Sequence, residues 1–433
     1  MPIKKTLECP GVYKLAEMRD GLLARVRIVG GTLRTKDLHN LADAATTFGN
    51  GKIDITNRAN LQVRGISNQG HKKFVNYLQK LKLIPDNPIH DRLRNITIDP
   101  LSGLADEDVD CRPLAKTLDV AIATVLNEDN KLESLSPKFS VVLDGGGPSN
   151  IAAVPHDICL IAQGIYFRLK ICGNDTQLAV IKENAVGAIL NLMQSLKYIA
   201  TDNGIKDTGL RLKIIQKEIG IDRLTNLIKD TVPEFSDHGF RAETSSLENL
   251  NPSTGALQIK GETSYAVTLS ARTNRIEAHQ LKGLAELTER FGKGLLRLTP
   301  WQAIIVEGIK EEDIAEVWQL SEALGFLTQP HEQNLRIITC AGSEGCPKGQ
   351  FETHATAIAL REALVSKATR KPTTVHLSAC EKGCASRQIA DYLYMQRQSE
   401  IGASLYRGAE PRTAKNGTHS STEKLVLELE KNL

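Results

Sequence analysis

Four of the eight cysteines lie in two tight pairs in the last quarter of the chain, and their spacing suggests metal chemistry. Cys340 and Cys346 are separated by five residues in TCAGSEGCPKG, and Cys380 and Cys384 by three residues in SACEKGCASRQ. Each pair can close on one small object, so the two pairs offer four thiolates to one centre. Thiolate is the ligand that iron–sulfur clusters and zinc take most readily. The pattern therefore predicts a soft metal centre.

A single 4Fe–4S cluster is the favoured occupant, because such a cluster takes four cysteine ligands. Zinc is the weaker interpretation, since structural zinc sites usually have about two to four residues between paired cysteines. Disulfide pairing is the plain alternative, although nothing in the sequence indicates an oxidising compartment. We expect the four scattered cysteines to be small buried hydrophobic residues: Cys9, Cys111, Cys159 and Cys172.

The length and charge of the chain restrict its class. The sequence has 433 residues, enough for two to four packed units, and a net charge of only +3. This balance favours neither a nucleic-acid partner nor an acidic tail. No apolar run is long enough to span a membrane, and no signal-like stretch follows the first residues. We therefore expect a cytoplasmic protein without a nucleic-acid or membrane partner.

The chain contains an internal duplication. FGNGKIDITNRANLQVRGI, from Phe48 to Ile66, aligns without a gap with FGKGLLRLTPWQAIIVEGI, from Phe291 to Ile309, at a constant offset of 243. Each copy predicts a strand (22–29 and 265–270), a helix (36–48 and 277–291), two short strands around a shared threonine, and a second helix (72–81 and 312–324). This alternation predicts an α+β domain with helices on one face of a mainly antiparallel sheet.

The duplication extends beyond these two segments. LRNIT, from Leu93 to Thr97, is similar to LRIIT, which ends directly before Cys340, and this places Ile98 at the Cys340 position. FSVVLDG, which ends at Gly145, is similar to the run that ends at Glu381, and this places Asp144 at the Cys380 position. The first half therefore lacks the cysteines. We expect one half to carry the redox centre and the other to bind a ligand.

Arginines and amides recur at even spacing on two predicted strands of the first half: Arg25 and Arg27 on one, and Arg58, Asn60, Gln62 and Arg64 on the next. Alternate residues of a strand point to one face. The second copy has instead Trp301, Ala303, Ile305 and Glu307. Guanidinium binds carboxylate through paired hydrogen bonds, so such a row suits a polycarboxylate ligand. The alternative is an ordinary solvated strand face.

The cysteine pattern, the duplicated halves and TNRANLQVRG together resemble the sulfite and nitrite reductase superfamily, whose members pair a 4Fe–4S cluster with siroheme or bind a related tetrapyrrole. The resemblance runs from about Cys9 to Gly408. It implies a sulfite/nitrite reductase-like α+β fold with internally duplicated ferredoxin-like half-domains plus two α/β lobes. The units expected from it are residues 1–84 and 241–330 for the half-domains, 85–240 for a tetrapyrrole-binding lobe, 331–408 for a cluster lobe and 409–433 for a polar tail.

Three motifs are similar to those of the precorrin-3B synthase family within this superfamily: CPGV from Cys9, RANLQ from Arg58, and SAC-x-KGCA from Ser378. The siroheme reductases typically have Arg-Gln after the threonine strand and Cys-Pro-Asn at the last cysteine pair, and this chain departs from both patterns. The family resemblance implies hydroxylation of precorrin-3A at C20 with O2 and closure of a lactone in aerobic cobalamin synthesis. The alternatives are a siroheme-containing sulfite or nitrite reductase and a non-catalytic tetrapyrrole or iron–sulfur carrier.

The resemblance also implies particular binding residues and partners. Arg211 and Lys213, in GLRLKII, fall where the reductases have a similar Arg-Leu-Lys beside their tetrapyrrole, although the exposed face of a predicted helix at 211–229 explains them equally well. In the reductases the last cysteine, here Cys384, bridges to the siroheme iron. The synthase family is also associated with a mononuclear non-haem iron, for which His156, Asp157, His354 and His376 are weak ligand candidates. No electron-carrier module is visible in the sequence, so we expect an external donor, either ferredoxin or an NAD(P)H-linked reductase.

Overall fold

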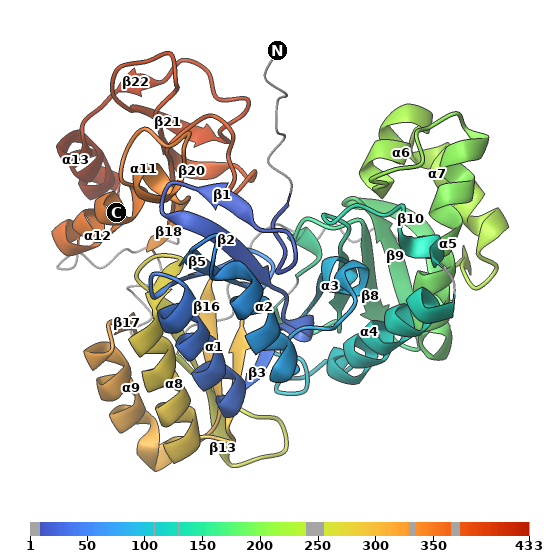
Figure 1. Cartoon of the computed structure of the whole chain (residues 1–433), viewed down its shortest axis with the longest axis horizontal. Helices are drawn as coiled ribbons and strands as arrows, with labels where there is room; N and C mark the ends of the chain where they lie inside the picture. Colours follow the sequence, from blue (N-terminus) through green and yellow to red (C-terminus); the bar gives the residue numbers. More distant parts are fainter. Residues whose placement is uncertain are drawn as a thin grey trace.

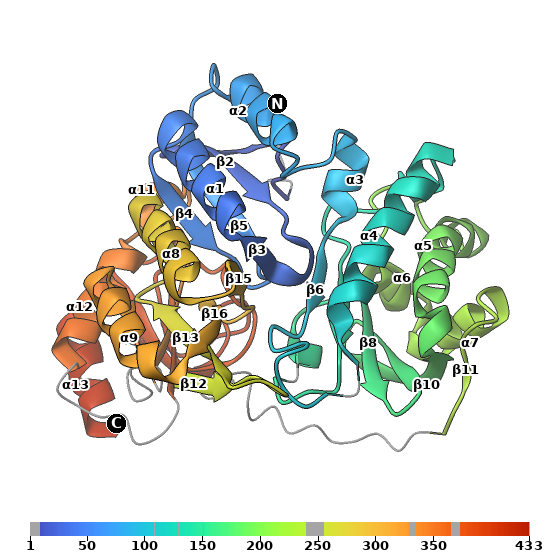
Figure 2. The same ribbon diagram turned by 90° about the horizontal axis from the view of Figure 1, so that it is seen from below.

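The computed structural model describes residues 9–107, 109–128, 130–149, 151–239, 255–328, 335–364 and 373–432. These residues form four sheets with helices packed against them (Figures 1 and 2). The sheets of the two half-domains are antiparallel, and those of the two lobes are mixed. The predicted α+β class with duplicated half-domains is confirmed. None of the helices in the described ranges is long and apolar enough to cross a membrane.

Both copies of the repeat fold in the predicted order. The first contains β1 (Ala16–Met18), β2 (Gly21–Val26), β3 (Thr32–Arg34), α1 (Thr35–Phe48), β4 (Lys52–Ile55), β5 (Leu61–Ile66) and α2 (His71–Lys80). The second contains β12 (Gly255–Gln258), β13 (Ser264–Ala271), β14 (Arg275–Glu277), α8 (Ala278–Phe291), β15 (Leu295–Leu298), β16 (Ala303–Lys310), α9 (Ile314–Ala323) and β17 (Phe326–Leu327). The first strand is shorter than predicted, because a 3₁₀ turn occupies Val29–Gly31.

The two half-domains exchange strands. Strand β3 of the first copy pairs with β15 of the second, and β14 of the second copy pairs with β4 of the first. Thr32 and Arg275, the first residues of the exchanged strands, are separated by the same offset of 243, so the exchange is reciprocal. Helices α1 and α8 lie side by side in both views, and one hydrophobic core contains residues of both copies (Figures 1 and 2). The two half-domains are therefore one structural unit.

The first lobe contains α3 (Pro88–Leu93), β6 (Ile96–Ile98), α4 (Cys111–Glu128), β7 (Val141–Asp144), β8 (Ile158–Gln163), β9 (Tyr166–Ile171), β10 (Asn174–Ile181), α5 (Ala185–Asp202), α6 (Leu212–Ile219), α7 (Ile221–Thr231) and β11 (Ser236–Asp237). The strand order is β11-β10-β9-β8-β7-β6. The single helix predicted at 211–229 is two helices, because Gly220 has φ 83°, which an α-helix does not allow.

The second lobe contains β18 (Leu335–Thr339), α11 (Gly342–Gly345), α12 (Thr353–Leu364), β19 (Thr373–Ser378), β20 (Ala390–Met395), β21 (Ser404–Ala409), β22 (Thr418–His419) and α13 (Thr422–Asn432). The strand order is β18-β19-β20-β21-β22. The segment expected to be a polar tail contributes β22 to this sheet, and Leu425 and Leu429 of α13 are buried in the core of the lobe. The tail is thus part of the lobe.

The lobes are themselves related by an offset of 242. The buried positions Cys111, Ala115, Leu118 and Ile122 of α4 correspond to Thr353, Ala357, Leu360 and Leu364 of α12. Strands β6 and β18 correspond at the same offset, so Ile98 does occupy the Cys340 position. The pairing register of β7 and β19, however, matches Val142 with Leu377. Gly145, rather than the predicted Asp144, therefore occupies the Cys380 position.

Candidate functional site

The two cysteine pairs meet at one edge of the second-lobe sheet. Cys340 directly follows β18, and Cys380 lies two residues beyond the end of β19. These strands are parallel neighbours, so their carboxyl ends lie side by side, and the Ala379 N–H contacts Cys340 Sγ at 3.3 Å. The arrangement of strands thus brings the two pairs together.

Tight turns bring the second cysteine of each pair back toward the first. Cys346 ends the short helix α11, whose first residue, Gly342, has φ 60°. Cys384 follows Gly383, which has φ 59°, and a side chain there would crowd Pro411. Both glycines adopt a backbone conformation that L side chains rarely take. These turns therefore require glycine at positions 342 and 383.

The four cysteines influence one another's pKa values through their charges. Burial, followed by the charges of Cys340, Cys384 and Cys346, raises the pKa of Cys380 to about 11. Burial also raises the pKa of Cys340, and the backbone N–H groups of Ala379 and Gly342 oppose that shift. Four thiolates gathered at one centre would repel one another, and a positively charged metal centre would offset that repulsion. The donor set fits an iron–sulfur cluster, which takes deprotonated thiols as ligands.

The histidines considered as iron ligands do not converge on a metal site. Both ring nitrogens of His156 contact protein groups, at Val154 O (2.8 Å) and Gly173 N (3.0 Å), and Asp157 is bound by Arg211. Burial lowers the pKa of His354 and of His376 to about 4, so both rings are neutral. Across the described ranges, no group of three or more His, Cys, Asp or Glu side chains is arranged to hold a metal ion. This holds for the four cysteines too, so the fit to a cluster rests on the chemistry of the thiols and on the neighbouring strand ends that carry them.

The first half-domain holds the loop that carries the first cysteine pair. Arg19 donates to the backbone oxygen of Ser343 at 3.0 Å, and its own N–H donates to Gly345 O at 3.2 Å. Glu344, in the centre of this loop, forms ion pairs with Lys52 and with Arg275. The cysteine loop is therefore attached to residues from both copies of the repeat.

Arg64 lies in a buried ionic network beneath this loop. Its guanidinium is 1% exposed and forms ion pairs with Asp20 (2.8 Å) and Asp54 (2.9 Å). A side chain at Gly345 would overlap the Arg64 guanidinium, so the loop backbone rests directly on it. Burial acts to raise the pKa of Asp54, but the charges of Arg275 and Arg64 outweigh it and lower the value to about 2. This network fixes the position of the loop.

The evenly spaced arginines and amides do not form a single exposed face. Arg58 and Asn60 lie in the turn before β5, where Ala59 has φ 53°, and the strand begins only at Leu61. Asn60 is 3% exposed, accepts from Ile28 N at 2.8 Å and donates to Asn95. Like Arg64, it is occupied by protein groups. The expectation of one continuous row fails because even spacing orders side chains only along an unbroken strand.

The two arginines of the first predicted strand also differ: Arg27 is buried in an ion pair, whereas Arg25 is partly accessible. Arg27 is 2% exposed and forms an ion pair with Asp91 at 3.1 Å. Arg25 is half-buried and donates to Cys9 Sγ at 2.8 Å. When the amide oxygen of Gln62 faces Arg25, it accepts hydrogen bonds from Nε and Nη2 at 3.2 and 2.9 Å. Arg25 and Gln62 thus form one unit on neighbouring strands.

Three of the predicted arginines come together. Burial, followed by the charges of Arg25 and Arg211, lowers the pKa of Arg58 to about 10. In the described part of the chain, the Arg58 guanidinium hydrogen-bonds only to the Pro155 carbonyl, at 3.3 and 3.4 Å. Arg211 precedes helix α6 and forms an ion pair with Asp157 at 2.7 Å, while Lys213 is exposed in the first turn of that helix. These arginines form a basic site built from the first half-domain and the first lobe.

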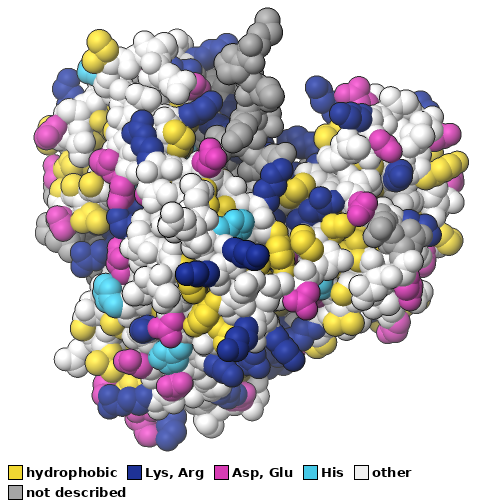
Figure 3. Space-filling model, in the orientation of Figure 1, with side chains coloured by type: hydrophobic (Ala, Val, Ile, Leu, Met, Phe, Trp, Pro, Cys, Tyr) yellow, Lys and Arg dark blue, Asp and Glu magenta, His cyan; other side chains and the backbone are white. Residues whose placement is uncertain are grey.

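The basic site continues to the exposed cysteine. The charges of Lys382, Arg387 and Arg412 oppose the rise that burial causes in the pKa of Cys384. Burial lowers the pKa of Arg387, and the charges of Arg412 and Arg211 lower it further. Lys and Arg side chains are visible at the base of the hollow between the two lobes and on the first lobe beside it (Figure 3). The structure therefore connects the arginines of the first half to the cysteines of the second.

Sequence reasoning missed several of these residues. Arg387 is three residues after Cys384, and this spacing is a signal that could have found it. Arg19, Asp20, Asp54 and Arg275 gave no such signal, because most of their partners lie more than 40 positions away in the sequence. The buried network could be recognised only from the structure.

Asp144 offers a test of the electrostatics in the first lobe. Burial is the largest cause that raises its pKa to about 6, although it accepts hydrogen bonds from Gly146 N and Ile151 N at 3.0 Å. A raised carboxyl pKa means that the folded state binds the proton more tightly, so this stability is present below about pH 4 and is lost as pH rises through about 6. The difference in free energy of unfolding between Asp144→Asn and the wild type should therefore change by about 2–3 kcal/mol in favour of the variant as the pH rises from 4 to 7. Urea unfolding at both pH values measures this difference; a constant difference would contradict it.

Comparisons with known proteins agree with this architecture. The family model described as the nitrite/sulfite reductase ferredoxin-like half domain matches residues 16–81 and 257–324, which are the two copies of the repeat. A solved structure of the Mycobacterium tuberculosis NirA protein superimposes with a TM-score of 0.74 at 19% identity, covering 94% of this chain and 79% of that one. The fold is thus that of the sulfite and nitrite reductase superfamily.

Curated relatives narrow the assignment. A precorrin-3B synthase from Sinorhizobium sp is 30% identical over 409 residues, covering 91% of this chain and 81% of the relative. A ferredoxin–nitrite reductase from Synechococcus elongatus is 26% identical and covers 90% of this chain and 78% of the relative. The chain belongs to the precorrin-3B synthase family within the sulfite and nitrite reductase superfamily. It is an oxidoreductase of that superfamily.

Proposed function

We propose that the protein is an iron–sulfur oxidoreductase that acts on a tetrapyrrole, with the precorrin-3B synthase reaction as its activity. This reaction hydroxylates precorrin-3A at C20 with O2 and forms a lactone from the ring A acetate. The observation that carries the proposal is the position of Arg25, Arg58 and Arg211 beside the arginines around Cys384. The identity with the Sinorhizobium relative favours this reaction over the others.

In this proposal the basic site holds the carboxylate arms of the macrocycle. Arg58 is the principal residue, because its guanidinium is desolvated, lies beside two other cations and has only a carbonyl oxygen as its hydrogen-bond partner among the described residues. Arg25, Arg211 and Lys213 extend the site along the hollow. Charge-assisted hydrogen bonds from a desolvated guanidinium to a carboxylate are among the stronger ones in proteins. The macrocycle would then lie between the first half-domain and the exposed Cys384.

Cys340, Cys346, Cys380 and Cys384 would hold one 4Fe–4S cluster, which supplies one-electron transfer when bound. The ion pairs of Arg64 and Glu344 would keep the ligand loop in place. Electrons would come from an external donor, either ferredoxin or an NAD(P)H-linked reductase. The mononuclear iron of the synthase family has no ligand set in the described part of the chain and is not assigned to residues.

The reaction can be tested directly. Anaerobically purified protein, reduced and mixed with precorrin-3A, should form a product only when O2 is admitted, and mass spectrometry should find one added oxygen atom. Isotopically labelled O2 identifies the source of that atom. An unchanged substrate, or a product without the label, would contradict the proposed reaction.

A siroheme-dependent sulfite or nitrite reductase is the second candidate. The similarity to the Synechococcus elongatus nitrite reductase over 90% of this chain favours it. The absorption spectrum of anaerobically purified protein separates the two, because a reductase must contain siroheme. A third candidate, a non-catalytic carrier, would bind cluster and tetrapyrrole without turnover of either type of substrate.

Replacing Arg58 with alanine should weaken tetrapyrrole binding. A charge-assisted hydrogen bond contributes roughly 1.5–3 kcal/mol, so the affinity should fall about tenfold or more. Titration of precorrin-3A or a stable uroporphyrinoid under anaerobic conditions measures this change. Arg34→Ala is the matched control, since it removes the same charge from a side chain that is 74% exposed. Equal affinities for the wild type and Arg58→Ala would remove Arg58 from the binding site.

A further inference from the structure

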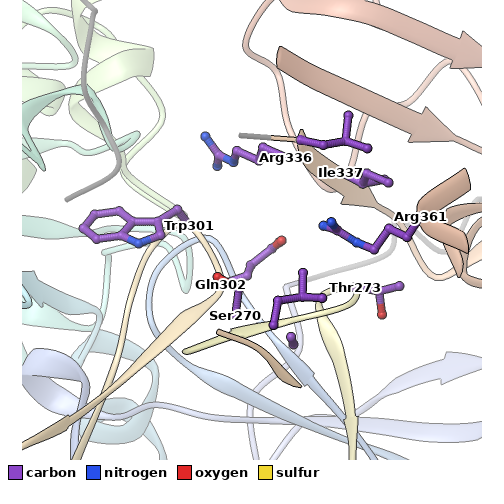
Figure 4. Close-up of a pocket in the computed structure, with 10 residues that line it drawn as sticks. Ser270, Thr273, Trp301, Gln302, Arg336, Ile337 and Arg361 are labelled. Atoms are coloured by element: carbon purple, nitrogen blue, oxygen red, sulfur yellow. The ribbon is translucent and has the colours of Figure 1, made fainter. Parts of the chain in front are cut away.

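A separate pocket lies where the second lobe meets the second half-domain (Figure 4). Its polar lining consists of Ser270, Thr273, Trp301, Gln302, Arg336 and Arg361. The guanidinium groups of Arg336 and Arg361 both project from the second lobe toward the side that carries Trp301 and Gln302 (Figure 4). The lining residues that the structure describes include no carboxylate. The pocket is thus positively charged.

Arg336 has no compensating partner among the described residues. Its Nε atom is buried without a hydrogen bond, and no described carboxylate forms an ion pair with it. Burial alone lowers its pKa to about 10. A desolvated guanidinium without a counter-charge is costly for a folded protein. A negative group bound beside the guanidinium would offset this cost.

In the first lobe, a carboxylate lies beside the arginine that corresponds to Arg336. At the offset of 242, Arg336 and Arg361 correspond to Arg94 and Asp119. Arg94 forms two parallel hydrogen bonds with Asp119, both at 2.9 Å. The first lobe therefore closes this position with an internal ion pair. In the second lobe, Arg361 stands at the position of that carboxylate, Asp119.

The other side of the pocket supplies further hydrogen-bond donors. Trp301 is 8% exposed, and its indole Nε1 is buried without a partner. Gln302 adopts φ 70°, a conformation that a residue with a side chain rarely takes, which places strain at the edge of the pocket. A second pocket shares Trp301, Gln302 and Arg336 with this one. It extends to residues 385–388, directly after Cys384.

We propose that this pocket binds a small oxyanion, a carboxylate, phosphate or sulfate, whose oxygen atoms take the place that Asp119 fills in the first lobe. Arg336 provides the main hydrogen bonds, and Arg361, Gln302 and Trp301 complete the set of donors. The donors of this pocket are not those of the basic site of Arg25, Arg58 and Arg211, although the adjoining hollow reaches Pro155 and Arg387. The proposal does not depend on the reaction that the protein catalyses.

The test uses the full-length protein with Trp318 replaced by phenylalanine, which leaves Trp301 as the single tryptophan. Sodium acetate, phosphate or sulfate replaces sodium chloride at constant ionic strength, while Trp301 fluorescence and the thermal midpoint are recorded. At least one of the three anions should give a saturable response, and Arg336→Gln should raise its half-saturation concentration at least tenfold. No saturable response to any of them, or an unchanged half-saturation in Arg336→Gln, would overturn the proposal.

Two variants make the test independent of folding. Arg94→Gln is the matched control: it should lower the thermal midpoint, because Asp119 loses both hydrogen bonds from Arg94 and keeps only His90, yet keep the wild-type anion response. Arg336→Gln in chloride should melt no lower than the wild type, and a loss as large as that of Arg94→Gln would contradict an uncompensated Arg336. If Arg336→Gln does not fold, half-buried Arg361→Gln provides the same titration, and an unchanged response there would also overturn the proposal.

Discussion

Replacing Cys380 with serine should remove most of the iron and acid-labile sulfide from the protein. Cys380 lies beyond the end of β19, beside the Cys340 position, where two parallel strands bring their carboxyl ends together. Serine is a poor ligand for a soft iron–sulfur centre, and the three remaining thiols cannot complete the set of four. Iron and sulfide analysis of anaerobically purified protein, with the visible absorption spectrum, measures the loss. The same result is expected for Cys340, Cys346 and Cys384.

The control for this prediction is Cys172→Ser. Cys172 is half-buried in the first lobe and has φ 50°, so its replacement tests the loss of a thiol away from the cysteine edge. Its iron content should equal that of the wild type. Full iron and sulfide in Cys380→Ser, or equal losses in both variants, would show that these four cysteines are not the ligand set.

The second large effect is expected for Arg64→Ala. The change leaves Asp20 without its ion-pair partner, while Asp54 keeps Arg275, and removal of one member of a buried ion pair costs about 3–5 kcal/mol in the free energy of unfolding. It also removes the group on which the Gly345 backbone rests. We therefore expect a less stable protein that also loses cluster iron. Chemical denaturation and iron analysis of the same preparation measure both effects.

The duplication supplies a matched control for Arg64. At the offset of 243, Asp54 and Arg64 correspond to Arg297 and Glu307, which form a buried ion pair of opposite order. Arg297 also donates to Pro100 O at 2.9 Å, so this pair supports the first lobe. Glu307→Ala should be destabilised to a similar degree but keep its iron. Equal iron loss in the two variants would mean that iron content follows stability alone.

The sequence was sufficient for the repeat and its elements. The constant offset between the copies located α1 and α8 within one residue of their observed ends, because apolar spacing along a helix is a local property. It could not reveal the exchanged strands β3 and β14. Each has three residues, and its partner lies more than 200 positions away in the chain. Pairing over such distances is set by packing of the whole unit.

The candidate site was partly predictable for a related reason. The cysteine pairs were found because the two cysteines of each pair lie close together in the sequence. Each pair also follows the end of a strand, and the two strands are neighbours in the sheet. The arginines were harder to sort, since Arg27 and Arg64 differ from Arg58 only in having carboxylate partners, Asp91 and Asp20, that folding brings to them. Sequence spacing gives the residue types at a site. It does not show which charges are already neutralised.

The reciprocal strand exchange has a consequence for the history of the molecule. A chain with a single copy of the repeat would leave one sheet without its last strand and would offer its own short strand to a neighbour. Two such chains would complete each other as a symmetric dimer, in which both lobes would be identical. In one polypeptide that requirement for identity disappears. One lobe has cysteines at its strand ends while the other has an isoleucine and a glycine, and the two lobes differ without loss of the common core.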